Sequence, residues 1–216
     1  MGKPLVTRAA AIPAGSVALS GELVVPEGVR GVVAFAHGSG SSRLSPRNLE
    51  VARVLHDSRI ATLLFDLLTP DEALDRRNVF DIPLLAERLV AATRWLRSES
   101  EVFGLPLGYF GASTGAAAAL WAAGEPDADV RAIVSRGGRP DLAGERLPLV
   151  RAATLLIVGE ADEVVLALNR QALAHLRCEN DMAVIPAATH LFEEPGTLEQ
   201  VARLAATWFA ARLMSA

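Results

Sequence analysis

The chain of 216 residues is 51% hydrophobic and carries a formal net charge of −4 at pH 7. This length favours one domain over residues 1–216, with a core large enough to need no disulfide or metal staple. The negative charge and the lack of a basic patch argue against nucleic acid or an anionic membrane surface as the main partner. Cys178 is the single cysteine, which excludes an internal disulfide and a cysteine-rich metal site.

The first residues, 1–8, lack the long apolar segment of a secretory signal, and no later stretch has the roughly 18 apolar residues of a membrane span. We therefore expect a cytoplasmic protein without a membrane partner. The sequence leaves open whether it is a monomer or a homodimer.

Strands and helices are expected to alternate along the first half of the chain. Residues 5–12 and 17–25 predict an antiparallel pair joined by a turn at 13–15. Continuous apolar runs at 31–36 and 60–64 are typical of strands buried on both faces. Between them, a helix is expected over residues 46–58, with Ser45 as its N-cap and Pro46 at its first position.

The second half continues this alternation. Residues 69–79 are polar and charge-rich, which predicts a surface loop or a short lid segment. The expected elements after it are a helix at 82–97, strands at 105–110, 130–134, 153–158 and 182–185, and helices from 114, at about 163–176 and at 197–213. Alternating buried strands and helices predict an α/β fold with a mostly parallel, doubly wound sheet and helices on both faces.

The strongest motif is Gly111-Ala112-Ser113-Thr114-Gly115, between an apolar strand and an Ala-rich helix. A strand, G-x-S-x-G and a helix in this order form a nucleophile elbow, in which the serine has strained backbone angles. Glycines two positions to either side avoid collisions in so tight a turn. Ser113 is therefore the candidate nucleophile.

Four histidines could supply the base. His190 follows the last predicted strand, where an imidazole reaches the carboxyl edge of the sheet, whereas His56 and His175 are expected inside helices. His37 ends an earlier strand and is interpreted as a structural side chain. We therefore expect His190 to be the general base.

The orienting carboxylate should follow the strand before that of the histidine, where Glu160, Asp162 and Glu163 are the choices. Asp162 is best placed, because two or three loop residues carry the chain from the end of the strand to the edge of the active site. Its alternative role is to cap the helix that begins at Glu163.

The turn at residues 37–42, His-Gly-Ser-Gly-Ser-Ser, is expected to complete an oxyanion hole through backbone N–H groups. We predict the N–H groups of Ser39 and Thr114 as the two donors. The turn lacks the P-loop lysine and the G-x-G-x-x-G pattern of phosphate and dinucleotide cradles, and no cofactor or metal is expected.

These motifs together resemble the α/β-hydrolase superfamily, and within it the dienelactone-hydrolase-like group of small members without a cap domain. The resemblance covers residues 31–213 and implies a sheet of about eight strands and a Ser113–Asp162–His190 triad. Dienelactone hydrolases proper carry cysteine at the elbow, so Ser113 favours an ordinary serine esterase. The stretch from Arg43 to Asn48 is similar to one in related chains but receives no role.

The sequence thus predicts a serine hydrolase that cleaves small or short-acyl carboxylic esters through an acyl-enzyme. Lactone or thioester hydrolysis on the same triad is the first alternative, since fold and triad do not fix the substrate. A ligand-binding protein without turnover is the second. Whether residues 66–82 act as a lid is left open.

Overall fold

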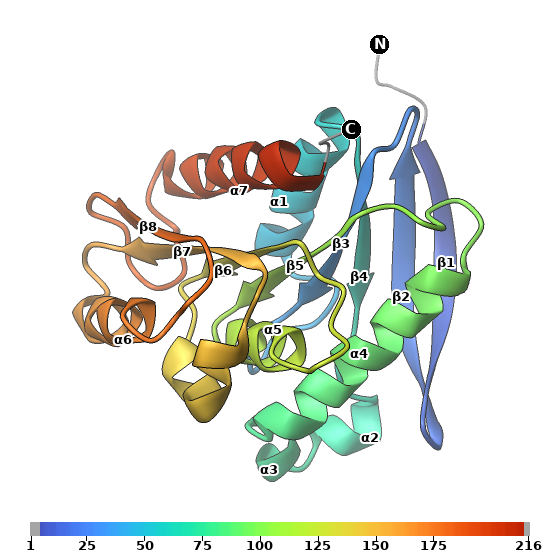
Figure 1. Cartoon of the computed structure of the whole chain (residues 1–216), viewed down its shortest axis with the longest axis horizontal. Coiled ribbons are helices and arrows are strands. Elements are labelled where there is room, and N and C mark those ends of the chain that lie inside the picture. Colours follow the sequence, from blue (N-terminus) through green and yellow to red (C-terminus); the bar gives the residue numbers. More distant parts are fainter. Residues whose placement is uncertain (1–4, 214–216) are drawn as a thin grey trace.

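Eight strands form one sheet in the computed structural model, which describes residues 5–213 (Figure 1). Their order across the sheet is β1-β2-β4-β3-β5-β6-β7-β8. The strands are β1 (Leu5–Ala14), β2 (Val17–Pro26), β3 (Gly31–Ala36), β4 (Ile60–Phe65), β5 (Leu107–Ala112), β6 (Ala132–Arg136), β7 (Ala153–Gly159) and β8 (Asn180–Ile185). Strand β2 pairs antiparallel with β1 and β4, and the other pairs are parallel, which confirms the predicted mostly parallel sheet.

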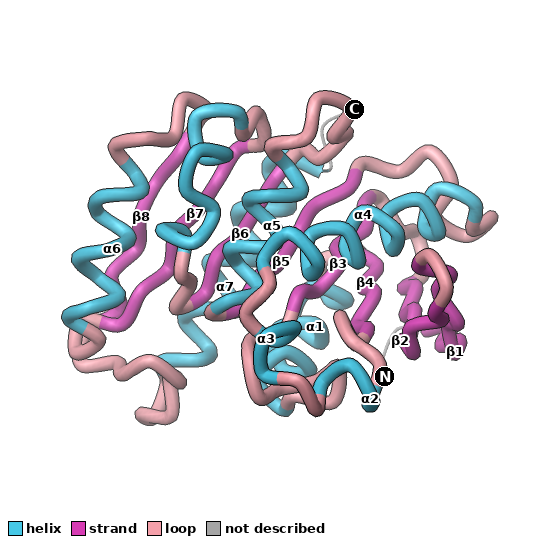
Figure 2. Tube along the Cα trace, turned by 90° about the horizontal axis from the view of Figure 1, so that it is seen from below, coloured by secondary structure: helices cyan, strands magenta, loops and turns pink. Residues whose placement is uncertain are grey.

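Helices cover both faces of the sheet. Helices α1 (Pro46–Asp57) and α7 (Thr197–Leu213) pack on one face, and α4 (Ile82–Ser98), α5 (Thr114–Ala123) and α6 (Glu163–Leu173) on the other, toward the viewer in Figure 2. Central strands are buried along their whole length because each face meets a helical layer. In β3, for example, Val33 and Phe35 point into the core between the sheet and α1 and α7. Val32 and Ala34 point into the core on the opposite face, beneath α4 and α5.

Local sequence signals account for several element ends. The Ser45 hydroxyl accepts the Asn48 N–H and Pro46 begins α1, as predicted.

Helix α5 is buried on nearly all sides, and its run of alanines lets it lie close to the sheet.

Three regions differ from the expectations. The predicted loop at 69–79 contains two one-turn helices, α2 (Pro70–Ala73) and α3 (Arg76–Val79), which Thr69 and Asp75 cap with their side chains. A stretch of 3₁₀ helix, η1 (Pro140–Leu149), lies between β6 and β7, where no element was expected. Helix α6 ends at Leu173, so His175 lies beyond it rather than inside it. None of these short pieces forms a cap domain within residues 5–213.

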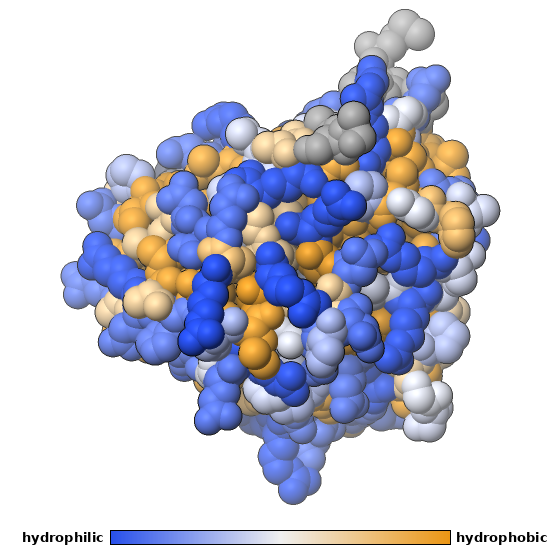
Figure 3. All heavy atoms as spheres, in the orientation of Figure 1, coloured by the Kyte–Doolittle hydropathy of each residue, from blue (hydrophilic) through white to orange (hydrophobic). Residues whose placement is uncertain are grey.

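The molecular surface mixes polar and apolar side chains. On the face shown in Figure 3, hydrophilic residues are interspersed with small apolar areas. In the described part of the chain, no helix combines the length and the apolar character needed to cross a membrane.

Candidate active site

Ser113 lies between the end of β5 and the start of α5, in a strained backbone conformation. Its φ of 50° and ψ of −121° are rarely adopted by a residue with a side chain. The Ser113 N–H donates to the Arg136 carbonyl at 3.2 Å, and the Ser113 carbonyl accepts the N–H groups of Ala116 and Arg139, both at 3.1 Å. Backbone hydrogen bonds on both sides therefore hold the strained residue in place.

The glycines around Ser113 are required by close backbone contacts. A Cβ on Gly115 would overlap the carbonyl oxygens of Ala36 and His37, and one on Gly111 would overlap the Ala116 backbone. The G-x-S-x-G spacing thus reflects how closely α5 approaches its own strand and the end of β3.

His190 and Asp162 are joined by a hydrogen bond. The distance from His190 Nδ1 to Asp162 Oδ2 is 2.6 Å, and Asp162 is the more buried of the two side chains. A carboxylate can only accept, so Nδ1 carries the proton, and in the neutral imidazole Nε2 is left as the acceptor. This is the tautomer that a general base needs.

The capping role considered for Asp162 is not observed. Asp162 holds the N-cap position of α6, but its side chain makes no capping hydrogen bond there. The neighbouring Glu160 instead accepts the Ala187 N–H at 3.0 Å, which ties the loop after β8 to the loop after β7. Among the three candidate acids, Asp162 is therefore the one bonded to His190.

The loop that carries His190 is itself strained. Ala187 and Phe192, which flank His190, have φ values of 57° and 56°. Gly137, after β6, packs under this loop: a Cβ there would lie 3.2 Å from the His190 carbonyl oxygen and 3.5 Å from Nδ1. The Arg-Gly-Gly-Arg turn at 136–139 thus belongs to the site, which the sequence alone did not indicate.

The predicted oxyanion donors lie side by side. The Ser39 N–H donates to the Thr114 hydroxyl at 2.9 Å, so the loop after β3 is fastened to the first residue of α5. Ser39 N–H is therefore occupied in this conformation, and a substrate oxygen would have to replace Thr114 Oγ1 as its acceptor. The sequence did not reveal this bond, because it joins residues that are far apart along the chain.

His37 joins the loop after β3 to the segment after β4. Its Nδ1 donates to the Gly38 carbonyl at 3.0 Å, and its Nε2 accepts the Leu67 N–H at 3.0 Å. Burial lowers the pKa of His37, which favours this neutral form. With both ring nitrogens used, His37 acts as a structural side chain.

The stretch from Arg43 to Asn48 fixes the same segment from the other side. Arg43 donates to the Asp66 carboxylate through its backbone N–H and its Nη1, both at 2.8 Å. A pocket of about 270 Å³ lies between the turn at residues 37–42 and the residues after β4. Its lining includes Gly38, Ser39, Leu67, Leu68, Val79 and Thr114.

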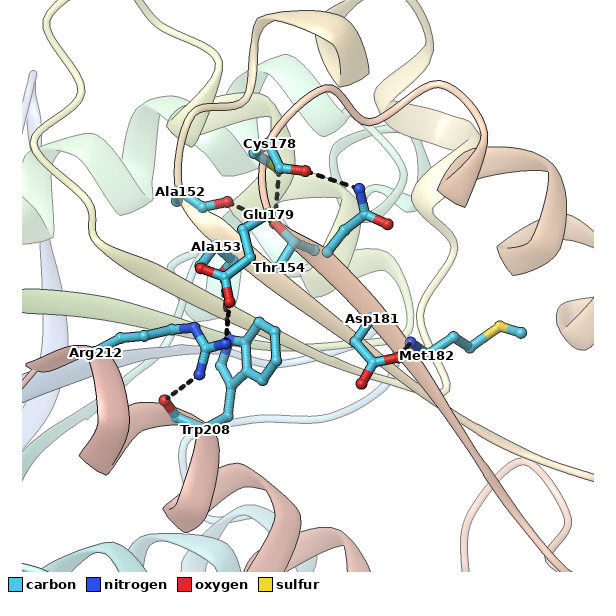
Figure 4. A network of polar contacts seen from close by, with 10 residues as sticks. Ala152, Ala153, Thr154, Cys178, Glu179, Asp181, Met182, Trp208 and Arg212 are labelled. Atoms are coloured by element: carbon cyan, nitrogen blue, oxygen red, sulfur yellow. Dashed lines mark hydrogen bonds and ion pairs between the residues drawn. The ribbon is translucent and has the colours of Figure 1, made fainter.

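Cys178 precedes β8 and therefore lies where the parallel strands begin, whereas Ser113 lies where β5 ends. Figure 4 shows Cys178 beside Thr154. Its Sγ is 3.8 Å from the Thr154 hydroxyl, and partial burial raises the pKa of the thiol. A thiol with a raised pKa is a poor nucleophile at neutral pH.

Comparisons with known proteins give close relatives along nearly the whole chain. No family model matches it. A dienelactone hydrolase from Anabaena variabilis is 54% identical, with a TM-score of 0.93 over 97% of this chain and 99% of that one. Est1E from Butyrivibrio proteoclasticus shares the fold, with a TM-score of 0.81 over 96% of this chain and 99% of that one, at 15% identity.

The curated relatives are longer. A protein of Mycobacterium tuberculosis, named as a phosphoribosyl transferase, is 60% identical over 206 residues, which are 95% of this chain and 46% of that protein. The chain therefore spans about half the length of the curated relatives it matches. More than half of the mycobacterial protein lies outside the match.

Proposed function

Because this chain belongs to the dienelactone-hydrolase-like group of the α/β-hydrolase superfamily, we propose that it is a serine hydrolase that cleaves small carboxylic esters. The observation that carries the proposal is the 2.6 Å hydrogen bond between His190 and Asp162. It fixes the imidazole tautomer that can take the proton of Ser113, which lies in the strained elbow.

The reaction proceeds through an acyl-enzyme. Ser113 Oγ attacks the ester carbonyl while His190 takes its proton, and His190 then gives that proton to the leaving alcohol. Asp162 stabilises the imidazolium that forms in between. Backbone N–H groups of Ser39 and Thr114 stabilise the negative oxygen, with Ser39 leaving the Thr114 hydroxyl as the oxyanion develops. Water then hydrolyses the acyl-enzyme with His190 as base.

Serine at the elbow favours ordinary esters over dienelactone as the substrate. Lactones and thioesters react at the same kind of carbonyl carbon, and the triad would serve them as well. Parallel assays with an aryl ester, a lactone and a thioester would rank the three by kcat/KM.

The test of the proposal is the Ser113→Ala variant, assayed with p-nitrophenyl acetate. We expect loss of a triad nucleophile to reduce kcat by about 10⁶, down to background hydrolysis. The elbow is held by backbone and glycines, so the thermal unfolding midpoint should stay close to that of the wild type. A fluorophosphonate probe should label the wild type and leave the variant unlabelled. Ester hydrolysis by the purified variant at the wild-type rate would refute the assignment.

A further inference from the structure

Arg136, the last residue of β6, is a buried cation without a counter-ion in the described structure. Its side chain is buried, with the residue 7% exposed, and its Nε has no hydrogen-bond partner among residues 5–213. Burial, together with the positive charge of Arg47, lowers the pKa of Arg136 to about 10. Burying an unpaired charge is costly, so a protein that retains one requires an explanation.

Arg47, in the first turn of α1, is the second cation. Its Nε is likewise buried without a partner in the described part of the chain. The nearest carboxylate oxygen, Glu193 Oε1, is 3.7 Å from Arg47 Nη1 and belongs to a side chain that is 67% exposed. An ion pair this long and this open to water neutralises Arg47 weakly.

The two arginines lie beside the proposed catalytic centre. The carbonyl of Arg136 accepts the Ser113 N–H, and the next residue, Gly137, packs against His190. The Arg136 guanidinium carbon is 5.9 Å from the ring centroid of Phe192, two residues after His190. Like Val134 in the same strand, Arg136 faces the α1 side of the sheet, which explains how it approaches Arg47.

We propose that Arg136 and Arg47 form an anion-binding subsite, which receives a carboxylate or phosphate group carried by the ester substrate. Guanidinium groups present paired N–H donors that match the oxygens of either anion. An anion between them would neutralise both charges and satisfy the free Nε groups. The assignment of this anion to an ester substrate depends on the proposed function, whereas anion binding itself does not.

Anion binding can be measured without turnover, by isothermal titration calorimetry and thermal unfolding at constant ionic strength. Sodium butyrate and inorganic phosphate represent the two sources of the anion, and butyramide is the neutral match for butyrate. We expect at least one of the two anions to bind the wild type and raise its unfolding midpoint, with butyramide binding more weakly than butyrate if the anion is a carboxylate.

The variant is Arg136→Met, which keeps an unbranched side chain and removes the guanidinium and its charge. We expect it to weaken anion binding by about tenfold to a hundredfold, the size of a lost charged hydrogen bond. Its unfolding midpoint without anion should equal or exceed that of the wild type, whereas a purely structural arginine would lower it. Arg131→Met is the control, because Arg131 is exposed and lies directly before the first residue of the same strand. Arg47→Met should weaken binding in the same direction and serves if Arg136→Met does not fold.

Preference for phosphate would assign a phosphorylated ester, and preference for butyrate a carboxylated one. The subsite is refuted if neither anion binds, or if Arg136→Met and Arg47→Met bind anions as well as the wild type. Hydrolysis of p-nitrophenyl acetate tests the esterase separately. Hydrolysis without anion binding would support the proposed function and refute the subsite. Anion binding without hydrolysis would support the subsite as a binding site and refute the esterase function.

Discussion

At the scale of single residues, Asp162 allows a sharp test of how the site works. It occupies the N-cap position of α6 but directs its carboxylate to His190. Asparagine would keep the shape of the side chain while losing the negative charge that stabilises the imidazolium. We therefore expect Asp162→Asn to lower kcat for p-nitrophenyl acetate by about 10⁴, with little change in unfolding midpoint.

Glu160→Gln and Glu163→Gln are the matched controls for this prediction. Glutamine at 160 still offers an oxygen to the Ala187 N–H, which Glu160 accepts in this structure. Both controls should keep kcat within about tenfold of the wild type, because neither acid is bonded to His190. If a control loses activity and Asp162→Asn retains it, the acid is misassigned, while Ser113 and His190 keep their roles.

The sequence predicts the residues of the candidate triad because each has a local signature. Ser113 lies in a motif, and Asp162 and His190 follow strands at the expected distances. Contacts between distant residues carry no such signature. The bond from Ser39 to Thr114 and the burial of Arg136 depend on how β3, β6 and α1 meet, so neither could be inferred from the chain alone.

At the scale of elements, His37 couples the loops after β3 and β4, and this predicts a pH dependence of stability. Burial lowers the pKa of His37 from its ordinary 6.5 in the folded state. Below pH 6.5 the unfolded chain therefore binds more protons at this residue than the folded one, so folding stability is lost as the pH falls further.

Thermal unfolding from about pH 8 down to about pH 5 would measure this loss, because histidine titrates in that range. In His37→Gln, whose side-chain oxygen can accept the Leu67 N–H, the midpoint should fall less steeply with pH than in the wild type. His175→Gln, on an exposed histidine beyond α6, should keep the wild-type slope. Equal slopes in all three proteins would show that His37 does not contribute.

The long elements follow their sequence patterns closely, with ends that shift by a few residues. Continuous apolar runs correctly predicted the buried strands, and the Ser45–Pro46 pair correctly predicted the start of α1. Helices α2 and α3 were missed because each has a single turn, too short for an apolar period to develop. Their capping residues, Thr69 and Asp75, were the available signal.

At the scale of the whole molecule, the site has no cap domain above it in the described structure. The pocket next to Ser39 and Thr114 measures about 270 Å³, slightly below the roughly 300–1,000 Å³ typical of small-molecule sites. A long acyl chain would leave methylene groups in water, and each would lose about 0.8 kcal/mol of the binding free energy that burial provides. We therefore expect kcat/KM to favour short acyl chains.

A series of p-nitrophenyl esters from acetate to dodecanoate would measure this preference. The highest kcat/KM should fall on acetate or butyrate and decline toward the longer chains. A maximum at decanoate or dodecanoate would contradict the prediction and indicate that residues 66–82 open as a lid over a longer groove.

The two ends of the described chain lie on the same side of the molecule (Figure 1). Leu5 pairs with Pro26 at the edge where the parallel strands begin, and Leu213 lies against Gly31, the first residue of β3. The pocket lies at the opposite edge, where these strands end. A carrier protein or a solid support attached through either end would therefore leave the entrance for substrate clear, and the tethered molecule should turn over as fast as the free one.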